Sequence, residues 1–351
     1  MIEPLELMRG VHLTATVFAV GGVGFLALMG TVPGRLAPAA MDTASVLRRR
    51  LSAIVWISLA AALVSGLGWL VLLGSAILEQ PVATVLRDGD LWTVLTGTRF
   101  GQVLLVRAGL ALALAAMLSW PPTVPLQLVA ACAFAALPAL TGHAGAALGP
   151  AGYLHLVSDI VHLVSACAWV GALPGLFMVL RTAIDPDFVL AMVRRFSLLG
   201  IASVVALTIS GLINSWNLLT SLSDLYTTDY GRLLTTKIAL FAIMVVFATT
   251  NRLVLTPRLP DLSARDAIRR NSMMEAALGV AVLLVVGVLG TIPPGGHKHV
   301  SPVPVSGSAA VTSPPMRLLP PGSALQEVPP ASPAAEFAHR ANSLKISRPG
   351  L

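Results

Sequence analysis

Residues 194–220 read RRFSLLGIASVVALTISGLINSWNLLT, a long apolar run that begins directly after two arginines. About 20 apolar residues in a helix cross roughly 30 Å of hydrocarbon, so this run is long enough to span a bilayer. Similar runs recur along the chain, and the alternating apolar and polar pattern of a membrane barrel is missing. The sequence therefore predicts an all-α, polytopic membrane bundle.

The composition of the 351 residues also indicates an integral membrane protein. The mean hydropathy is +0.82 and only 11% of the residues are charged, which excludes a water-soluble chain. The net charge of +7 comes mostly from arginines in short loops, so we interpret it as a topology signal and not as a nucleic-acid footprint. The two cysteines, Cys132 and Cys167, lie in apolar segments without CxxC spacing, which excludes a disulfide framework and a thiolate metal motif.

Eight apolar segments have the length of a transmembrane helix. They cover residues 5–31, 51–78, 101–120, 124–141, 153–180, 194–220, 230–255 and 270–292. Arginines concentrate in the loops after the first, fifth and seventh segments, and the positive-inside rule places these loops in the cytoplasm. Both termini are then expected on the outer side of the membrane. Residues 293–351 are rich in Pro, Ser and Ala, which predicts a disordered external tail.

The two halves of the chain resemble each other. Residues 9–13, RGVHL, resemble residues 159–163, DIVHL, so that His12 corresponds to His162. Three further pairs of motifs follow in the same order: RRLS 49–52 and RRFS 194–197, SGL 65–67 and SGL 210–212, and TRFG 98–101 with Arg107 and TDYG 228–231 with Lys237. We infer two four-helix repeats, residues 1–150 and 151–292. They should have the same orientation, because each contains an even number of spans.

Histidines gather in the outer half of the predicted bundle or at its outer rim: His12, His143, His155 and His162. Ionisable groups are costly within a bilayer and usually face the protein interior or a wet cavity, so this clustering favours a functional site. For any single one of them, a structural histidine near the interface is the alternative.

His155, Asp159 and His162 share one face of a helix. On a straight helix the two histidines are about 10.5 Å apart along the axis, which is long for two ligands of one ion. Asp159 is adjacent to both, and it can either ligate a metal or orient an imidazole. With His12 facing the deeper position, these residues predict a relay of metal positions. Arg9 corresponds to Asp159, and the two either serve the site as a pair or simply neutralise each other.

Imidazole suits copper, zinc, nickel and iron, and thioether favours Cu(I). Met8 lies one turn before His12, and His297 and His299 follow the last span, where they would capture a metal outside. Arg107 and Lys237 lie at equivalent positions inside their spans, and they either snorkel to lipid headgroups or bind an anionic group such as a propionate.

Several of these motifs together resemble the copper-resistance CopD family. They are His155, WVGAL 169–173, SGLIN 210–214, TDYGRLL 228–234 with Lys237, and Asn251-Arg252 before Pro257. The resemblance is most specific over residues 150–292 and extends more weakly over all eight spans. It implies a bacterial inner-membrane protein that moves copper inward from the periplasm beside a separate CopC-like copper-binding partner. Both termini and the tail, residues 293–351, would then lie in the periplasm. The membrane histidines of the family carry over onto His12, His155 and His162, and onto His143.

The leading hypothesis is a copper transporter and not an enzyme. The ion would enter at His143 and His155, pass to Asp159, His162 and His12, and leave inward. Near the inner end of the last span only Glu275, Met273 and Met274 offer donors, and Glu275 either serves as one or pairs with an adjacent arginine.

Two other functions stay open. A haem- or porphyrin-binding redox protein, of the b-type cytochrome or HemJ kind, would use paired axial histidines, with Arg107 and Lys237 for the propionates. A copper sensor or assembly scaffold is the third interpretation. The sequence shows no P-loop, nucleophile triad or dinucleotide motif, which argues against ATP-driven pumping and hydrolysis.

Overall fold

The computed structural model describes residues 3–30, 38–120, 123–141, 149–182, 185–219 and 221–292, and every regular element in them is helical. The long helices are α1 (Pro4–Gly30), α2 (Pro38–Leu78), α5 (Arg99–Ser119), α7 (Gly149–Val170), α9 (Pro186–Leu218), α11 (Asp229–Thr250) and α12 (Leu262–Leu289). The shorter ones are α3 (Val82–Arg87), α4 (Asp90–Gly97), α6 (Val124–Ala136), α8 (Leu173–Thr182) and α10 (Asp224–Thr227). Two 3₁₀ turns, η1 (Leu137–Leu140) and η4 (Thr256–Arg258), and one π-helical turn, η3 (Asn251–Leu255), complete them. The all-α class is thus confirmed for these residues, and the predicted tail, 293–351, lies outside them.

The predicted count of eight membrane spans is not confirmed. Within the described residues, seven helical segments are long and apolar enough to cross a membrane. The remaining predicted span, 124–141, is the shorter apolar segment Val124–Leu140, formed by α6 and η1. Pro138 lies at the start of η1, where its missing N–H and its ring prevent the α-helix from continuing.

The predicted span 153–180 consists of two helices, α7 and α8, that meet at Gly171. At this break α1 crosses very close, because a Cβ added to Gly171 would collide with the carbonyl oxygen of Val17. A Cβ added to Gly21 would collide with the backbone of Gly171. Small residues allow such a close approach of helices within a membrane. The crossing therefore lies one to three turns beyond the histidine of each helix, His12 or His162.

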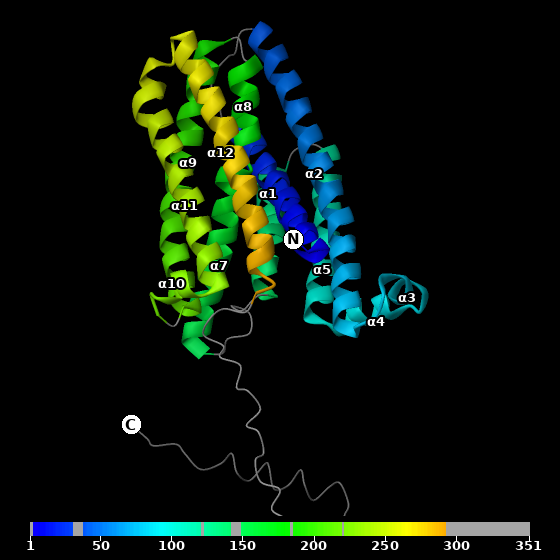
Figure 1. Ribbon diagram of the computed structural model, residues 1–351. Coiled ribbons are helices and arrows are strands. Elements are labelled where there is room, and N and C mark those ends of the chain that lie inside the picture. Colours follow the sequence, from blue (N-terminus) through cyan, green and yellow to red (C-terminus); the bar gives the residue numbers. More distant parts are fainter. Residues whose placement is uncertain are drawn as a thin grey trace, which may run out of the picture. The chain divides into compact units, whose positions relative to one another are not determined.

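Helix α1 is the central element of this helical unit. It contacts α2, α6, α7, α8 and α12, and Figure 1 shows it between α2 and α12. Among the 18 consecutive residues that form the most apolar part of α1, 61% are buried. The corresponding share in the segment Asp229–Arg258 is 6%. Large apolar side chains such as Ile238 and Val246 stay exposed on α11. These faces suit contact with lipid chains.

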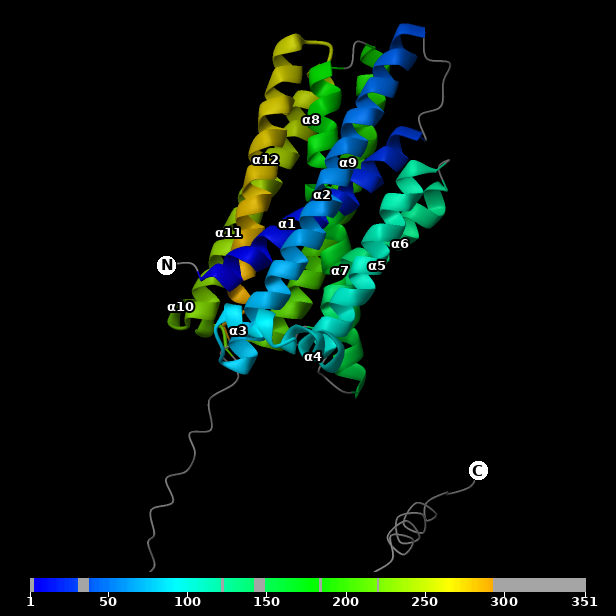
Figure 2. The same cartoon turned by 90° about the vertical axis from the view of Figure 1, so that its right-hand side faces the viewer.

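The short connecting helices mark one end of the long helices. Helices α3, α4 and α10 lie at this end in both views (Figures 1 and 2). The start of α2, the end of α8 and the start of α12 lie at the opposite end. The arginine-rich residues 48–50 and 265–270 belong to the starts of α2 and α12. The basic segments therefore gather at one end of the helical unit.

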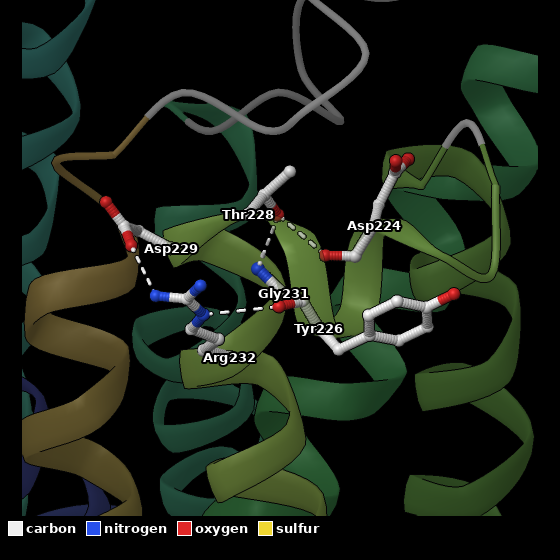
Figure 3. A network of polar contacts seen from close by, with 6 residues as sticks. All are labelled: Asp224, Tyr226, Thr228, Asp229, Gly231 and Arg232. Carbon is white, nitrogen blue, oxygen red and sulfur yellow. Dashed lines mark hydrogen bonds and ion pairs between the residues drawn. The ribbon is translucent and has the colours of Figure 1, made fainter.

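Helices α5 and α11 begin with the same capping arrangement. The Thr98 hydroxyl accepts a hydrogen bond from the Gly101 N–H at 3.0 Å. The Thr228 hydroxyl accepts one from the Gly231 N–H, also at 3.0 Å (Figure 3). A threonine at this position satisfies one of the free N–H groups of the first helical turn. The matched TRFG and TDYG motifs thus form matched structures.

Candidate functional site

His12 is buried in α1, where its Nδ1 lies 3.0 Å from the carbonyl oxygen of Ala62 and 3.2 Å from the Ser65 hydroxyl on α2. The Ser65 hydroxyl donates to the Ala61 carbonyl at 2.6 Å. Because a carbonyl oxygen can only accept, the proton of the neutral imidazole is on Nδ1. The lone pair is therefore on Nε2.

That lone pair is occupied by Arg107. The guanidinium Nη2 lies 3.0 Å from His12 Nε2, and because a guanidinium has only donors, the imidazole accepts. Arg107 also donates to Thr16 Oγ1 and to the Phe134 carbonyl, both at 2.8 Å. Arg107 is only 3% exposed, so it does not snorkel to headgroups. In this arrangement His12 has no nitrogen free for a metal.

His162 on α7 resembles His12 at Nδ1 but not at Nε2. Its Nδ1 lies 3.0 Å from the Ser210 hydroxyl on α9, and that hydroxyl donates to the Ala206 carbonyl at 2.6 Å. The imidazole therefore donates from Nδ1 and has its lone pair on Nε2. Among the described residues no hydrogen bond to Nε2 is found. The ring of His162 thus presents an open nitrogen of the kind that binds a metal.

Three further predicted residues lie on α7 and α11 in the second half of the chain. Lys237, which corresponds to Arg107, acts electrostatically on both His162 and Asp159. Asp159 accepts a hydrogen bond of 3.4 Å from the amide of Asn214, and it also interacts electrostatically with His155. His155 is 8% exposed. A carboxylate, an ammonium and two imidazoles therefore occupy one region between α7, α9 and α11.

The structure does not assemble a complete metal cage from the residues that it describes. In that part of the chain, no three His, Cys, Asp or Glu side chains lie close enough to hold one ion. The hydrogen bonds of His12 and of His162 each remain within one half of the chain. Three predicted ligands, His143, His297 and His299, lie outside the described residues.

Arg9 and Met8 have apolar neighbours. The Arg9 guanidinium lies 5.5 Å from the centre of the Trp69 ring and directly against Gly290, where an added Cβ would collide with it. No ion pair between Arg9 and Asp159 is found within the described ranges. The Met8 sulfur packs against Gly68 of α2, where an added Cβ would lie 3.1 Å away. Both side chains thus contribute to the packing of α1.

The inner end of α12 also differs from expectation. Glu275 is 1% exposed and accepts a hydrogen bond of 2.8 Å from the Asn251 amide, so its partner is not an adjacent arginine. Met273 and Met274 are 54% and 50% exposed. Their thioethers do not join Glu275 in a shared donor set.

Sequence reasoning missed the partners of the two imidazoles. Ser65 and Ser210 belong to the repeated SGL motif, and that repetition was the available signal. Thr16 and the Phe134 carbonyl had no such signal, because they lie 91 and 27 residues from Arg107 in the sequence.

Comparison with known families and proteins gives consistent results over both halves. The family described as copper resistance protein D matches residues 190–289, and the family described as copper resistance protein D-like, N-terminal domain, matches residues 1–153. Neither description names haem, and nothing in these matches supports the haem alternative. No solved structure matches the chain.

Three curated proteins are similar to this chain. Inner membrane protein YebZ of Escherichia coli is 33% identical over 211 residues, which cover 58% of this chain and 72% of that protein. Copper resistance protein D of Pseudomonas syringae is 30% identical over 220 residues, which cover 57% of this chain and 71% of that protein. Copper transport protein CutJ of Bacillus subtilis is 34% identical over 158 residues, 44% of this chain, and the match spans only 28% of the length of CutJ.

Proposed function

The chain belongs to the copper resistance protein D family, and on that premise we propose that it carries copper through the membrane at a site centred on His162. The observation that supports this site most is the open Nε2 of His162, whose ring is held from the other side by Ser210. Imidazole is a preferred ligand of copper, and a hydrogen bond to the second ring nitrogen fixes the tautomer that ligates.

His155 and Asp159 complete the proposed site on α7. His155 receives the ion near the outer end of the helix, together with His143, and Asp159 either ligates it or balances its charge. His297, His299 and Met8 serve at most as outer capture groups. Lys237 sets the electrostatics of the site, because an ammonium beside Asp159 and His162 keeps a bound cation from being held too tightly.

His12 is the inner member of the proposed relay. It becomes a ligand only when Arg107 moves away from Nε2, since a guanidinium and a metal ion cannot share one lone pair. Arg107 therefore acts as the gate of this second position. The proposed path runs from the α7 site to His12 and then to the cytoplasm.

We propose that the two halves are parallel repeats of four helices, residues 1–150 and 151–292. Corresponding contacts support this: His12 with Ser65 and His162 with Ser210, and Thr98 with Gly101 and Thr228 with Gly231. A further pair agrees, because Gln102 donates to the Thr96 carbonyl as Arg232 donates to the Tyr226 carbonyl. The α6–η1 segment is the short fourth member of the first repeat.

The proposed location is the bacterial inner membrane, with the arginine-rich end in the cytoplasm and both termini in the periplasm. Copper then moves from the periplasm inward, and a separate CopC-like periplasmic protein is the proposed donor. No catalytic reaction is part of this function.

Cellular copper accumulation tests the proposal. We expect His162→Ala to abolish accumulation while the protein stays abundant and inserted in the membrane. Thr208→Ala on α9 is the matched control, because the Thr208 hydroxyl donates only to the Val204 carbonyl of its own helix. Normal accumulation in His162→Ala cells would refute the site. A Soret band in the purified protein would favour haem instead.

A further inference from the structure

A cavity of about 150 Å³ lies at the end of the helical unit away from the α7 site. Its walls come from the end of α7 and from α8, α9, α11, η3, η4 and α12. They are mostly apolar, with Val193, Val204, Val245 and Ile268 among the lining residues. Glu275 lines this apolar cavity. An ionisable group inside a membrane-spanning bundle is a functional candidate by default, because placing it there is costly.

The two carboxylate oxygens of Glu275 differ. Oε1 accepts a hydrogen bond of 2.8 Å from the Asn251 amide, and Asn251 in turn accepts one of 2.7 Å from Asn271. Oε2 is buried and has no hydrogen-bond partner among the described residues. The Trp169 indole interacts with the carboxylate from the same wall, but outside the geometry of a full hydrogen bond. Oε1 is therefore held by a hydrogen bond, whereas the carboxylate's contact with the Trp169 indole leaves Oε2 without one.

No cation balances Glu275 within the described residues. Arg252 is the other charged residue that lines the cavity, and it donates to the Ser197 hydroxyl at 2.6 Å and forms no ion pair with Glu275. The residues contributed by α7, α8, α9 and α11 to the cavity are uncharged. A buried carboxylate without a counter-ion is unfavourable, whereas the protonated carboxyl group is neutral. The surroundings thus favour a bound proton at Oε2.

A soft metal ion fits this position poorly. The neighbouring donors are amide and hydroxyl groups, and the thioethers of Met273 and Met274 are exposed and do not join Glu275. Oxygen ligands suit hard cations and not Cu(I). The chemistry of the cavity therefore points to a proton and not to Cu(I).

The backbone that presents Asn251 is irregular. The π-helical turn Asn251–Leu255 follows α11 directly, and Asn251 is its first residue. Such turns are found frequently at functional sites. The turn directs the Asn251 amide toward α12, where it holds Oε1 of Glu275.

We propose that Glu275 is a proton-binding site, reached through this cavity, whose loading and release accompany the movement of copper. A hydronium ion that enters the cavity transfers a proton to Oε2, which leaves a water molecule and a neutral carboxyl group. In the reverse step the carboxyl group returns the proton to water as hydronium. The coupling part of this proposal rests on the proposed copper transport, whereas proton binding at Glu275 does not.

Infrared difference spectroscopy of the purified full-length protein tests proton binding without copper. We expect a pH-dependent carboxylic acid C=O band that shifts in D₂O, persists in Asp159→Asn and is lost in Glu275→Gln. Glutamine keeps the oxygen that Asn251 binds, so the variant should unfold at no lower temperature than the wild type. A band that persists in folded Glu275→Gln, or its absence from the wild type at every pH, would overturn the proton site.

Copper flux into liposomes tests the coupling. We expect an imposed pH difference to change the initial copper flux of the wild type, and we expect Glu275→Gln to lose that response. The His162→Ala variant should move no copper but keep the infrared band, so that failure of the copper site and failure of the proton site are told apart. An unchanged response to pH in Glu275→Gln would refute the coupling.

Discussion

His12 and His162 stand at corresponding positions of the two halves, but only His12 has both ring nitrogens hydrogen-bonded in the described structure. Each donates from Nδ1 toward a serine on the following long helix, Ser65 or Ser210. The Nε2 of His12 accepts a hydrogen bond from Arg107, whereas no partner of His162 Nε2 is found among the described residues. The same scaffold thus holds a histidine whose Nε2 is occupied by Arg107 in one half and a histidine whose Nε2 can bind a metal in the other.

The difference follows from one change of residue type. Arg107 and Lys237 occupy corresponding positions, nine residues after the capping threonine of α5 or α11. The guanidinium has five donors in a rigid fork, so it can bond His12, Thr16 and Phe134 at once. The lysine ammonium is a point charge on a flexible stem, and it acts on His162 through space only.

The largest expected effect separates the two histidines directly. We expect His162→Ala to weaken copper binding by the purified protein at least about 100-fold, since it removes a ligand and not merely an orienting group. His12→Ala should leave the affinity within about threefold of the wild type, because its Nε2 is occupied by Arg107. Equilibrium dialysis with copper quantification measures both. An equal loss of copper affinity in the two variants would show that His12 and His162 do not differ as ligands.

Replacing Arg107 should lower the stability of the protein more than replacing Lys237. Arg107→Met leaves the Phe134 carbonyl and His12 Nε2 without donors in a buried site, so we expect a loss of about 2 kcal/mol in the free energy of unfolding. Lys237→Met breaks no hydrogen bond in the described structure and should cost less than about 1 kcal/mol. Unfolding in detergent compares them.

The same Arg107→Met variant sharpens the comparison further. With Nε2 of His12 released, we expect a second and weaker copper ion to bind, visible as an increased copper content. An unchanged copper content in the folded variant would argue against Arg107 as the gate.

The serines should show a smaller contrast. Ser210→Ala removes the acceptor that orients His162, and the loss of such an orienting partner weakens metal binding about 10-fold. Ser65→Ala removes the corresponding partner of His12 and should leave copper affinity unchanged. Competition titrations with a copper chelator are sensitive enough for this difference. A larger loss of affinity in Ser65→Ala than in Ser210→Ala would contradict the assignment of His162 as the ligand.

The smallest effect tests the equivalence of the halves and not their difference. Thr98→Ala and Thr228→Ala each remove a helix cap, so each should lower the free energy of unfolding by about 1 kcal/mol. Thermal unfolding of the two variants should give shifts of similar size. A large effect in one variant only would show that the caps differ in their surroundings.

Much of this arrangement could be predicted from the sequence. The apolar runs predict the long helices, and the RGVHL and DIVHL motifs identify His12 and His162 as corresponding residues. The break at Gly171 and the end of α6 at Ala136, just before Pro138, could not be predicted from hydropathy, because both stretches remain apolar where the α-helix stops.

The contact that distinguishes the two histidines could not be predicted either. Arg107 lies 95 residues from His12 in the sequence, and an arginine in an apolar segment can as well extend to the headgroups. Only the hydrogen bonds of Arg107 to α1 and α6 decide between the two. Likewise the Asn251–Glu275 bond depends on a π-helical turn that leaves no periodic signal.

Nitrogen-15 NMR of histidine-labelled protein, titrated with diamagnetic Cu(I) and assigned with His12→Ala and His162→Ala, tests the central claim most directly. We predict that the Nε2 resonance of His162 shifts with the first equivalent of metal, while both ring nitrogens of His12 keep their positions. A shift at His12 before His162, or none at His162 while copper is bound, would contradict the account.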